Sequence, residues 1–259
     1  GQSLNIIYSG ATKGWIPFLD KEVANVPVAP QTQKGIFGFG NGAGYANTGV
    51  TNIVSSSGVV ASDVSAVGTA RNGLAAATYG GDKAIFAYGH TGTSGNQTSS
   101  LKNLVSNSGV VASDVTGVGS ARRYLAAASY GGDKAIFAYG STAGDGYAYV
   151  SLKNLVNSSG VVAADVTGVG TARAFFPAAG YGGDKAIFAY GSTGSKVSLK
   201  NLVNNSGVVA ADVTGVGTAR YRLAAASYGV GLAIFGYGDS GSLTAITNKV
   251  NSSGVVASD

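Results

Sequence analysis

The residue types that carry most protein chemistry are scarce in this chain. Its 259 residues include one histidine, His90, and neither cysteine nor methionine. A catalytic serine or cysteine needs a base beside it, and no motif surrounds His90, which stands in a segment that varies between repeats. A zinc site needs several nitrogen or sulfur ligands. We therefore expect a protein that is not an enzyme, with no catalytic residue, no metal and no cofactor. We interpret His90 as a contact residue in an exposed loop.

The carboxylates support the same expectation. Eight of the twelve acidic residues recur at fixed places, in a GGDK sequence or at the end of a VVAxD sequence. An arginine recurs eight residues after the VVAxD aspartate, as Asp114 and Arg122 show. Because enzymatic sites usually break such symmetry, we interpret this pattern as a repeated structural ion pair or turn cap. The acids outside the pattern are few and scattered: Asp20, Glu22, Asp145 and Asp239.

The chain is built from five near-identical units. The sequence ARRYLAAASYGGDKAIFAYG at residues 121–140 recurs with a few changes at 70–89, 172–191 and 219–238. A more diverged copy ends in KGIFGFG at 34–40. Each copy is followed by a second block, such as NLVNSSGVVAADVTGVG at 154–170. Units of this size cannot bury a core alone, so they must pack on one another.

Each unit contains four short segments with strand character. The alanine-rich segment, IFAY, NLV and VVAADV are separated by Gly, Asn, Ser and Asp clusters, and no helical period is present. We therefore predict an all-β fold, a single five-bladed β-propeller with four-stranded blades, whose first blade packs on the fifth. The propeller covers residues 25–259, with blades near 25–65, 68–116, 119–167, 170–214 and 217–259. Residues 1–24, which hold the only tryptophan, Trp15, are expected to form a connector or docking segment.

Variation between the units is confined to two places. From the VVAxD aspartate to the isoleucine of the next IF the distance is always 22 residues, whereas from that isoleucine to the following aspartate it ranges from 25 to 29. The asparagine of NLV always lies 11 residues before the aspartate, so the length varies in the loop between the second and third strands. The second variable place follows Ala-Arg. In an up-and-down blade both places open on one face, and the constant GGDK and NSSG turns open on the opposite face.

The variable face is rich in tyrosine, phenylalanine, arginine, serine and glycine, a composition typical of adaptable binding surfaces. The alternative interpretation is that exposed loops tolerate change, while tight turns stay constant because they need Gly or Asn backbone geometry. The residues that we expect to contact a ligand are Tyr45, His90, Arg123, Tyr124, Tyr147, Tyr149, Phe175, Phe176, Lys196, Tyr221 and Arg222.

The overall charge and hydropathy narrow the choice of partners. The net charge is +5, but most charged residues belong to the repeat and no lysine-rich run is present. We therefore expect no nucleic-acid partner. No apolar run reaches the length of a transmembrane helix, so we expect no membrane insertion.

The order of arginine, small apolar strand, Gly-Gly turn and aromatic strand ending in glycine resembles the kelch repeat. Kelch blades usually carry a tyrosine and a tryptophan in their later strands, where this chain has Leu or Val and Asp. The sequences NLVNSSGVVAADVTGVGTAR and GGDKAIFAYG also resemble repeat-rich structural proteins of tailed bacteriophages, including marine ones. That second resemblance covers nearly the whole chain and implies a virion or extracellular location.

We therefore predict a non-catalytic recognition module, carried by a phage virion or tail fibre, that binds a host-surface glycan or protein through the variable face. The alternative is a purely structural virion or scaffold protein whose propeller decorates or spaces an assembly. In both cases the segment around Trp15 is expected to dock on neighbouring virion subunits.

Overall fold

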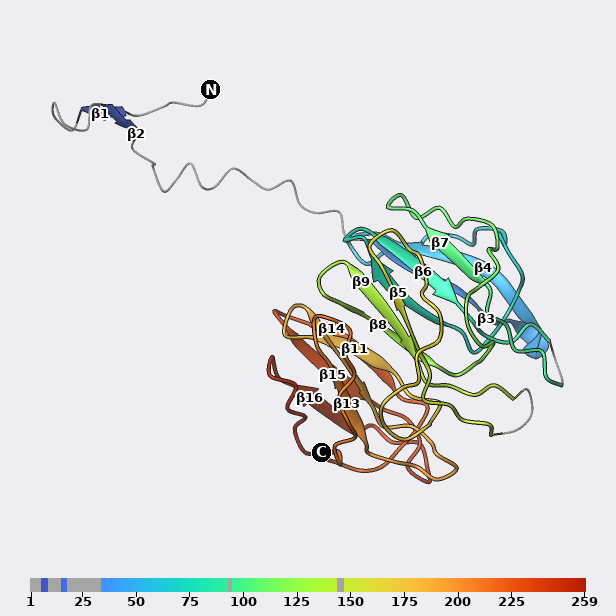
Figure 1. The fold of residues 1–259 in the computed structure, drawn as a ribbon. Coiled ribbons are helices and arrows are strands. Elements are labelled where there is room, and N and C mark those ends of the chain that lie inside the picture. Colours follow the sequence, from blue (N-terminus) through green and yellow to red (C-terminus); the bar gives the residue numbers. More distant parts are fainter. Residues whose placement is uncertain (1–5, 9–14, 18–33, 93–94, 144–146) are drawn as a thin grey trace.

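The computed structural model describes residues 6–8, 15–17, 34–92, 95–143 and 147–259. These residues form an all-β protein, with a single short 3-10 turn, η2 (Ala43–Tyr45), among them. Small antiparallel sheets follow one another along the chain (Figure 1). In the described part of the chain no helix is long and apolar enough to span a membrane.

Each of the last four units forms one three-stranded sheet. In every case the alanine-rich strand pairs with the IFA strand, which pairs with the NLV strand. The sheets are β5 (Ala75–Tyr79), β6 (Lys83–Ala87) and β7 (Lys102–Val105); β8 (Ala126–Tyr130), β9 (Lys134–Ala138) and β10 (Lys153–Val156); β11 (Ala178–Tyr181), β12 (Lys185–Ala189) and β13 (Lys200–Val203); and β14 (Ala224–Tyr228), β15 (Leu232–Gly236) and β16 (Thr247–Val250).

The first unit and the N-terminal segment form two-stranded pairs. The first unit consists of β3 (Gly35–Asn41) and β4 (Asn47–Val54), joined through η2. The strand expected at the start of this unit, around residues 26–30 and equivalent to the alanine-rich strands of the other units, lies outside the described residues. Near the N-terminus, β1 (Ile6–Tyr8) pairs with β2 (Trp15–Pro17), with Tyr8 opposite Trp15. The rest of the proposed docking segment also lies outside the described residues.

The core lies between consecutive units. The middle strand of a sheet is buried on both faces, and in β9 Ile136 and Phe137 are fully buried although their side chains point in opposite directions. Each buried hydrophobic cluster joins residues of two neighbouring units. The alanine-rich strands β5, β8, β11 and β14 lie side by side in chain order (Figure 1), because their small side chains allow close approach. An isolated unit would therefore expose half of its core.

The expected fourth strand pairs with its sheet at only two points. Val111 bridges to Val105 and Val115 bridges to Lys102, so the outer segment has one more residue between the bridges than β7 has. The Asn103 side chain donates to the Ala112 carbonyl between these bridges. The extra residue bends the segment away from the ladder, as in a β-bulge. The sheets are therefore three-stranded with a bridged edge, and the expectation of four regular strands was wrong.

The last unit has an open face. Tyr237 is 64% exposed, whereas the equivalent tyrosines of the three preceding units, Tyr88, Tyr139 and Tyr190, are each 1% exposed. The expected packing of the first unit on the fifth would cover this ring, and that packing is not observed among the described residues. In the part of the chain that the structure describes, the five units therefore form a row with two ends.

Candidate binding face

A buried arginine, Arg71, Arg122, Arg173 or Arg220, holds each of the last four units together. In the third unit the Arg122 Nε donates to the Tyr139 carbonyl at 2.9 Å, and its Nη2 donates to the Asn154 side chain. The guanidinium is fully buried and lies 3.7 Å from the Asp165 carboxylate. The structural ion pair is therefore confirmed, but the expected partner, Asp114, was wrong. The aspartate that pairs with Arg122 ends the same unit, because the bridged fourth segment brings Asp165 back to the place where the unit begins.

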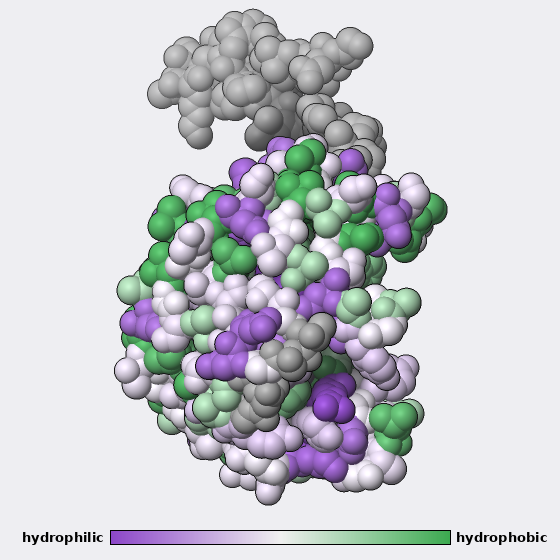
Figure 2. Space-filling view, turned by 90° about the vertical axis from the view of Figure 1, so that its right-hand side faces the viewer, coloured by the Kyte–Doolittle hydropathy of each residue, from purple (hydrophilic) through white to green (hydrophobic). Residues whose placement is uncertain are grey.

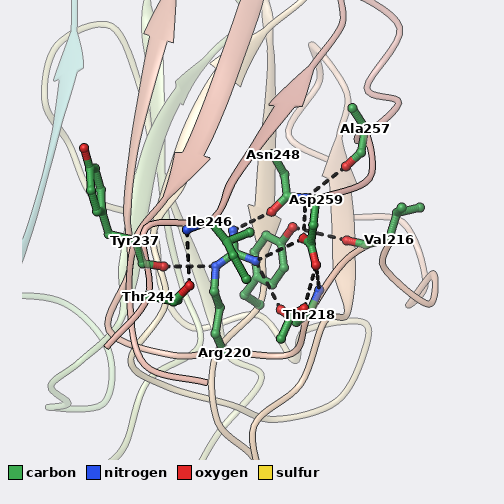
Figure 3. A network of polar contacts seen from close by, with 10 residues as sticks. Val216, Thr218, Arg220, Tyr237, Thr244, Ile246, Asn248, Ala257 and Asp259 are labelled. Atoms are coloured by element: carbon green, nitrogen blue, oxygen red, sulfur yellow. Dashed lines mark hydrogen bonds and ion pairs between the residues drawn. The ribbon is translucent and has the colours of Figure 1, made fainter. Parts of the chain in front are cut away.

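The same arginine joins the unit to the one before it. The Arg122 Cζ lies 4.1 Å from the centre of the Tyr88 ring, and the Tyr88 hydroxyl donates to the Val118 carbonyl at 3.2 Å. The arrangement recurs in the last unit, where Arg220, Asn248 and Asp259 form the corresponding network (Figure 3). Arg71 and Arg173 also stack on an aromatic ring of the preceding unit.

The pair of buried Arg71 and partly buried Asp114 is ionised at neutral pH. Burial lowers the pKa of Arg71 to about 10, and the Asp114 carboxylate partly opposes this shift. Burial raises the pKa of Asp114, but hydrogen bonds from Thr69 and Asn103, together with the Arg71 charge, outweigh it and hold the pKa below its usual value. Arg71 and Asp114 are therefore part of the structural network of the second unit.

The constant turns at one end of the sheets also join neighbouring units. The Gly80 amide donates to the Asp133 carbonyl of the next GGDK turn at 2.7 Å. The Lys102 ammonium donates to the Gly160 carbonyl of the next NSSG turn at 3.2 Å. A Cβ at Gly160 would lie 2.9 Å from the Tyr79 ring. Inter-unit packing therefore gives these turns a second reason to stay constant, in addition to their backbone geometry.

The two variable regions of each unit meet at the opposite end of the sheets. In the third unit Arg123, which follows the buried arginine, bridges to Ser141 of the variable loop, and Ser141 bridges to Tyr149. Equivalent bridges join Asn72 to His90 and Tyr221 to Asp239. The loop and the segment after Ala-Arg thus lie side by side, as the blade pattern predicts.

A backbone ladder connects these variable segments from unit to unit. The Tyr124 amide donates to the Gly73 carbonyl at 2.7 Å, the Phe175 amide to the Tyr124 carbonyl at 3.1 Å, and the Arg222 amide to the Phe175 carbonyl at 2.8 Å. All four residues have positive φ angles, between 55° and 60°. Glycine adopts this left-handed conformation freely, whereas the other three residues are strained in it. The structure therefore holds three large side chains in an unfavourable backbone conformation at equivalent positions.

An open cavity of about 520 Å³ lies along this ladder. All five units contribute to its walls, the first through its loop and the others through the residues after the buried arginine. The lining residues are Asn41, Tyr45, Gly73, Leu74, Tyr124, Leu125, Phe175, Phe176, Arg222 and Leu223.

Aromatic rings and cations alternate beside the cavity. The Tyr124 and Phe175 rings stack with centroids 4.1 Å apart, and Phe175 meets Tyr221 edge to face at 6.2 Å. The Arg123 Cζ lies 4.7 Å from the centre of the Tyr124 ring, and the Arg222 Cζ lies 5.1 Å from that of Tyr221. Polarised ring faces attract such cations. The rings and guanidinium groups of the cluster thus contact one another, but the Arg222 side chain remains exposed to solvent.

The other expected contact residues lie around this cluster. Lys196 lies 5.6 Å from the centre of the Tyr221 ring and forms an ion pair with Asp239 at 3.1 Å. Tyr147, which is exposed, and Tyr149 pack their rings together at 5.6 Å in the loop of the third unit and do not line the cavity. Of the acids that break the repeat symmetry, Asp20, Glu22 and Asp145 lie outside the described residues.

Two of the expected contact residues are in the wrong environment for a surface contact. His90 is 3% exposed, and its Nε2 lies 3.0 Å from the Gly95 carbonyl, so the expectation of an exposed histidine was wrong. Phe176 is buried between units and packs edge to face on Tyr139, so its ring belongs mainly to the core. The left-handed turn at Phe175 separates the two phenylalanines, leaving Phe175 in the cluster beside the cavity.

Sequence comparison between units missed part of the cavity wall. Leu74, Leu125 and Leu223 recur in the same position and were therefore assigned to the strands. Asn41 begins the variable loop of the first unit but was not among the expected contact residues. The convergence of the five units is a property of their packing that no single unit shows.

The described residues contain no group of three or more histidine, aspartate or glutamate side chains that could hold a metal ion. Comparison with protein-family models and with curated proteins finds no match to this chain. The resemblances to kelch repeats and to bacteriophage structural proteins therefore remain expectations.

Proposed function

We propose that the protein is a non-catalytic recognition module that binds a glycan or protein on a host-cell surface through the cavity and the aromatic cluster beside it. The observation that carries this proposal is the meeting of variable positions from all five units at one cavity of about 520 Å³. The constant positions form the units and their junctions. A surface that only tolerates change has no reason to gather its variation around one concavity.

The chemistry of the cavity suits this role. Tyr124, Phe175 and Tyr221 supply flat apolar surfaces of the kind that stack on sugar faces or fill protein pockets. Arg222 supplies a planar set of donors that can bind hydroxyl, carboxylate or carbonyl groups in a forked arrangement. The positive φ angles of Tyr124 and Phe175 hold these side chains in place at a cost in backbone energy, and such strain is common at functional sites.

We further propose that the sheets are blades of a β-propeller-like array of five units, with the cavity near the axis. The side-by-side inner strands and the antiparallel order within each sheet support this arrangement. The resemblance of the repeats to kelch sequences and to phage structural proteins supports a place on a virion or tail fibre. A protein on a virion or tail fibre would meet the surface of the host cell, so we expect its partner there.

The proposal is tested by binding of the purified chain to a glycan array and to intact bacterial cells. A triple variant, Tyr124→Ser with Phe175→Ser and Tyr221→Ser, removes the aromatic cluster. We expect binding to fall about tenfold or more, because aromatic anchors dominate such surfaces. The matched control changes three exposed valines of the constant turns, Val110, Val161 and Val208, to serine and should leave binding unchanged. Far-UV circular dichroism shows whether both triple variants remain folded.

The second candidate function is a structural one, in which the array spaces or decorates an assembly. The exposed aromatic residue at each end of the row, Phe37 and Tyr237, favours this alternative. If the wild-type chain binds no cell surface and the aromatic triple variant still assembles normally, the structural role is supported and the recognition role is rejected.

A further inference from the structure

The two ends of the row expose the two halves of one contact. At every internal junction the aromatic residue that ends the IFAY run packs against the phenylalanine of the next IF sequence. Ring centroids are 5.5 Å apart for Tyr88 and Phe137, and 5.6 Å for Tyr190 and Phe235. In the last unit the first half, Tyr237, is 64% exposed, and in the first unit the second half, Phe37, is 65% exposed. Phenylalanines equivalent to Phe37 are at most 4% exposed.

A second pair of complementary groups lies beside the first. At internal junctions Tyr79 and Leu104 contact the glycine of the next NSSG turn, so that a Cβ at Gly160 would lie within 3.1 Å of both side chains. In the last unit the equivalent tyrosine, Tyr228, is 39% exposed. In the first unit the equivalent glycine, Gly58, has no neighbouring atom within 4 Å of a Cβ built on it.

The open end of the last unit is also less charged at its turn. The GGDK sequence of the preceding units is replaced by Gly229-Val230-Gly231-Leu232, which removes an aspartate and a lysine. Val230 is almost fully exposed. At the other end of the row, on the side that carries β3 and β4, hydrophobic residues form patches on the surface among polar ones (Figure 2).

We propose that the exposed face of the last unit binds the exposed face of the first unit in a second copy of this chain, head to tail. This contact would continue the interface between the units, because equivalent aromatic residues make the same contact at each internal junction. Tyr237 of one copy packs on Phe37 of the other, and Tyr228 covers the Gly58 turn. Such a contact is heterologous, so it generates a closed ring or an extended row of copies.

Two substitutions make this junction weaker than the internal ones. In the sequence of the first unit, Glu22 aligns with the repeated arginine of the other units, so this unit supplies no equivalent guanidinium to stack on Tyr237. The last unit carries Lys249 where the preceding units have Leu104, Leu155 and Leu202. The lysine faces the Gly58 turn with its charge and reduces the apolar contact. We therefore expect association that depends on protein concentration.

Sedimentation velocity of the wild-type chain over a wide concentration range measures the association. We expect larger species to appear as the concentration rises. Tyr237→Ser and Phe37→Ser each remove one half of the contact, and each variant alone should remain monomeric. An equimolar mixture of these variants retains one intact junction and should form a heterodimer. Val161→Ser, at a similarly exposed residue away from both ends, is the control and should associate like the wild type.

A third variant tests the geometry in the opposite direction. Lys249→Leu restores the side chain of the internal junctions and should tighten association about tenfold, as expected when a charge facing an apolar contact is removed. The proposal is overturned if the wild-type chain stays monomeric at all concentrations, as it would if the first unit covered the last within one copy. It is also overturned if the mixed variants fail to associate, or if Lys249→Leu associates no more tightly than the wild type.

Discussion

The buried arginines provide the sharpest test of how the units are held together, and Arg122→Met is the most informative variant. Methionine preserves much of the apolar stem but removes every donor. The carbonyls of Tyr139 and Ser120 and the side-chain oxygen of Asn154 lose their donated hydrogen bonds. A buried acceptor without a partner costs about 1–3 kcal/mol, and breaking a buried ion pair costs about 3–5 kcal/mol.

These costs overlap, and the Asp165 side chain is 25% exposed, so water can solvate part of the carboxylate. We therefore expect Arg122→Met to lower the free energy of unfolding by about 3–5 kcal/mol in total. Urea denaturation at neutral pH, followed by far-UV circular dichroism, measures this quantity. Because repeat arrays can unfold unit by unit, the slope of the transition must be compared with that of the wild type.

The adjacent residue provides a matched control. Arg123 carries the same charge, but its Nε has no hydrogen-bond partner among the described residues, and its guanidinium stacks on the Tyr124 ring. Arg123→Met should cost about 1 kcal/mol or less, the usual value of a partly exposed cation–π contact. If Arg122→Met costs no more than Arg123→Met, the buried network does not stabilise the array as we infer.

Two further predictions follow from the junctions and their charges. The pKa of Asp165 is held below its unfolded value of 3.8, because hydrogen bonds from Ser120 and Asn154 and the charge of Arg122 outweigh the effect of burial. A depressed carboxyl pKa stabilises the fold above the unfolded pKa, and this stability is lost as the pH falls through the folded pKa. Urea titrations from pH 7 to pH 2 should therefore show stability falling below about pH 4, with a shallower fall in Asp165→Asn; an equally steep fall in that variant would contradict the assignment. Gly160→Ala and Gly132→Ala both place a methyl group at a positive φ, 78° and 80°, but only the first meets a neighbour, the Tyr79 ring at 2.9 Å. Gly132→Ala should cost about 1–2 kcal/mol and Gly160→Ala clearly more; equal losses in urea denaturation would show that the turn does not support the junction.

Much of the local structure could be predicted from the sequence because the repeats act as an internal comparison. The three strands of each unit lie where short apolar runs alternate with Gly, Asn and Asp clusters, and the variable loops lie between the second and third strands. The fourth segment could not be predicted in detail. Its pairing is interrupted by one extra residue between the two bridges, where the Asn103 side chain donates to the Ala112 carbonyl.

The long-range contacts were harder to predict than the strands. Eight residues separate Asp114 from Arg122, yet each pairs within its own unit, Asp114 with Arg71 and Arg122 with Asp165. The spacing of these residues along the chain does not predict which aspartate pairs with which arginine. The exposure of the last face was equally hard to predict, since five similar units suggest a closed ring. The exposure of Tyr237 and Phe37 shows that the described residues of the first unit do not cover the fifth.

The variable positions lie together at one end of the sheets, as predicted, but variability did not predict the environment of each side chain. Phe175 and Phe176 are adjacent and chemically identical and both line the cavity, but the left-handed turn at Phe175 places one ring in the aromatic cluster and the other mainly in the core. The residue type at the position of His90 varies between units, but the His90 ring is buried, although it was expected to be exposed on its loop. Burial within a loop depends on how that loop folds back, which neither composition nor spacing reports.

The most direct test of the binding face uses the chain's own variation. Replacing Arg123 and Tyr124 by the residues of the second unit, as Arg123→Asn with Tyr124→Gly, installs a pair that the fold already accepts at Asn72 and Gly73. Because glycine relieves the positive φ at residue 124, the variant should be folded and at least as stable. The measurement is its affinity for the cell surface or glycan that the wild-type chain binds. We predict a loss of about tenfold or more; a folded variant that binds as tightly as the wild type, or a wild-type chain that binds no such surface, would contradict a recognition site at this cavity.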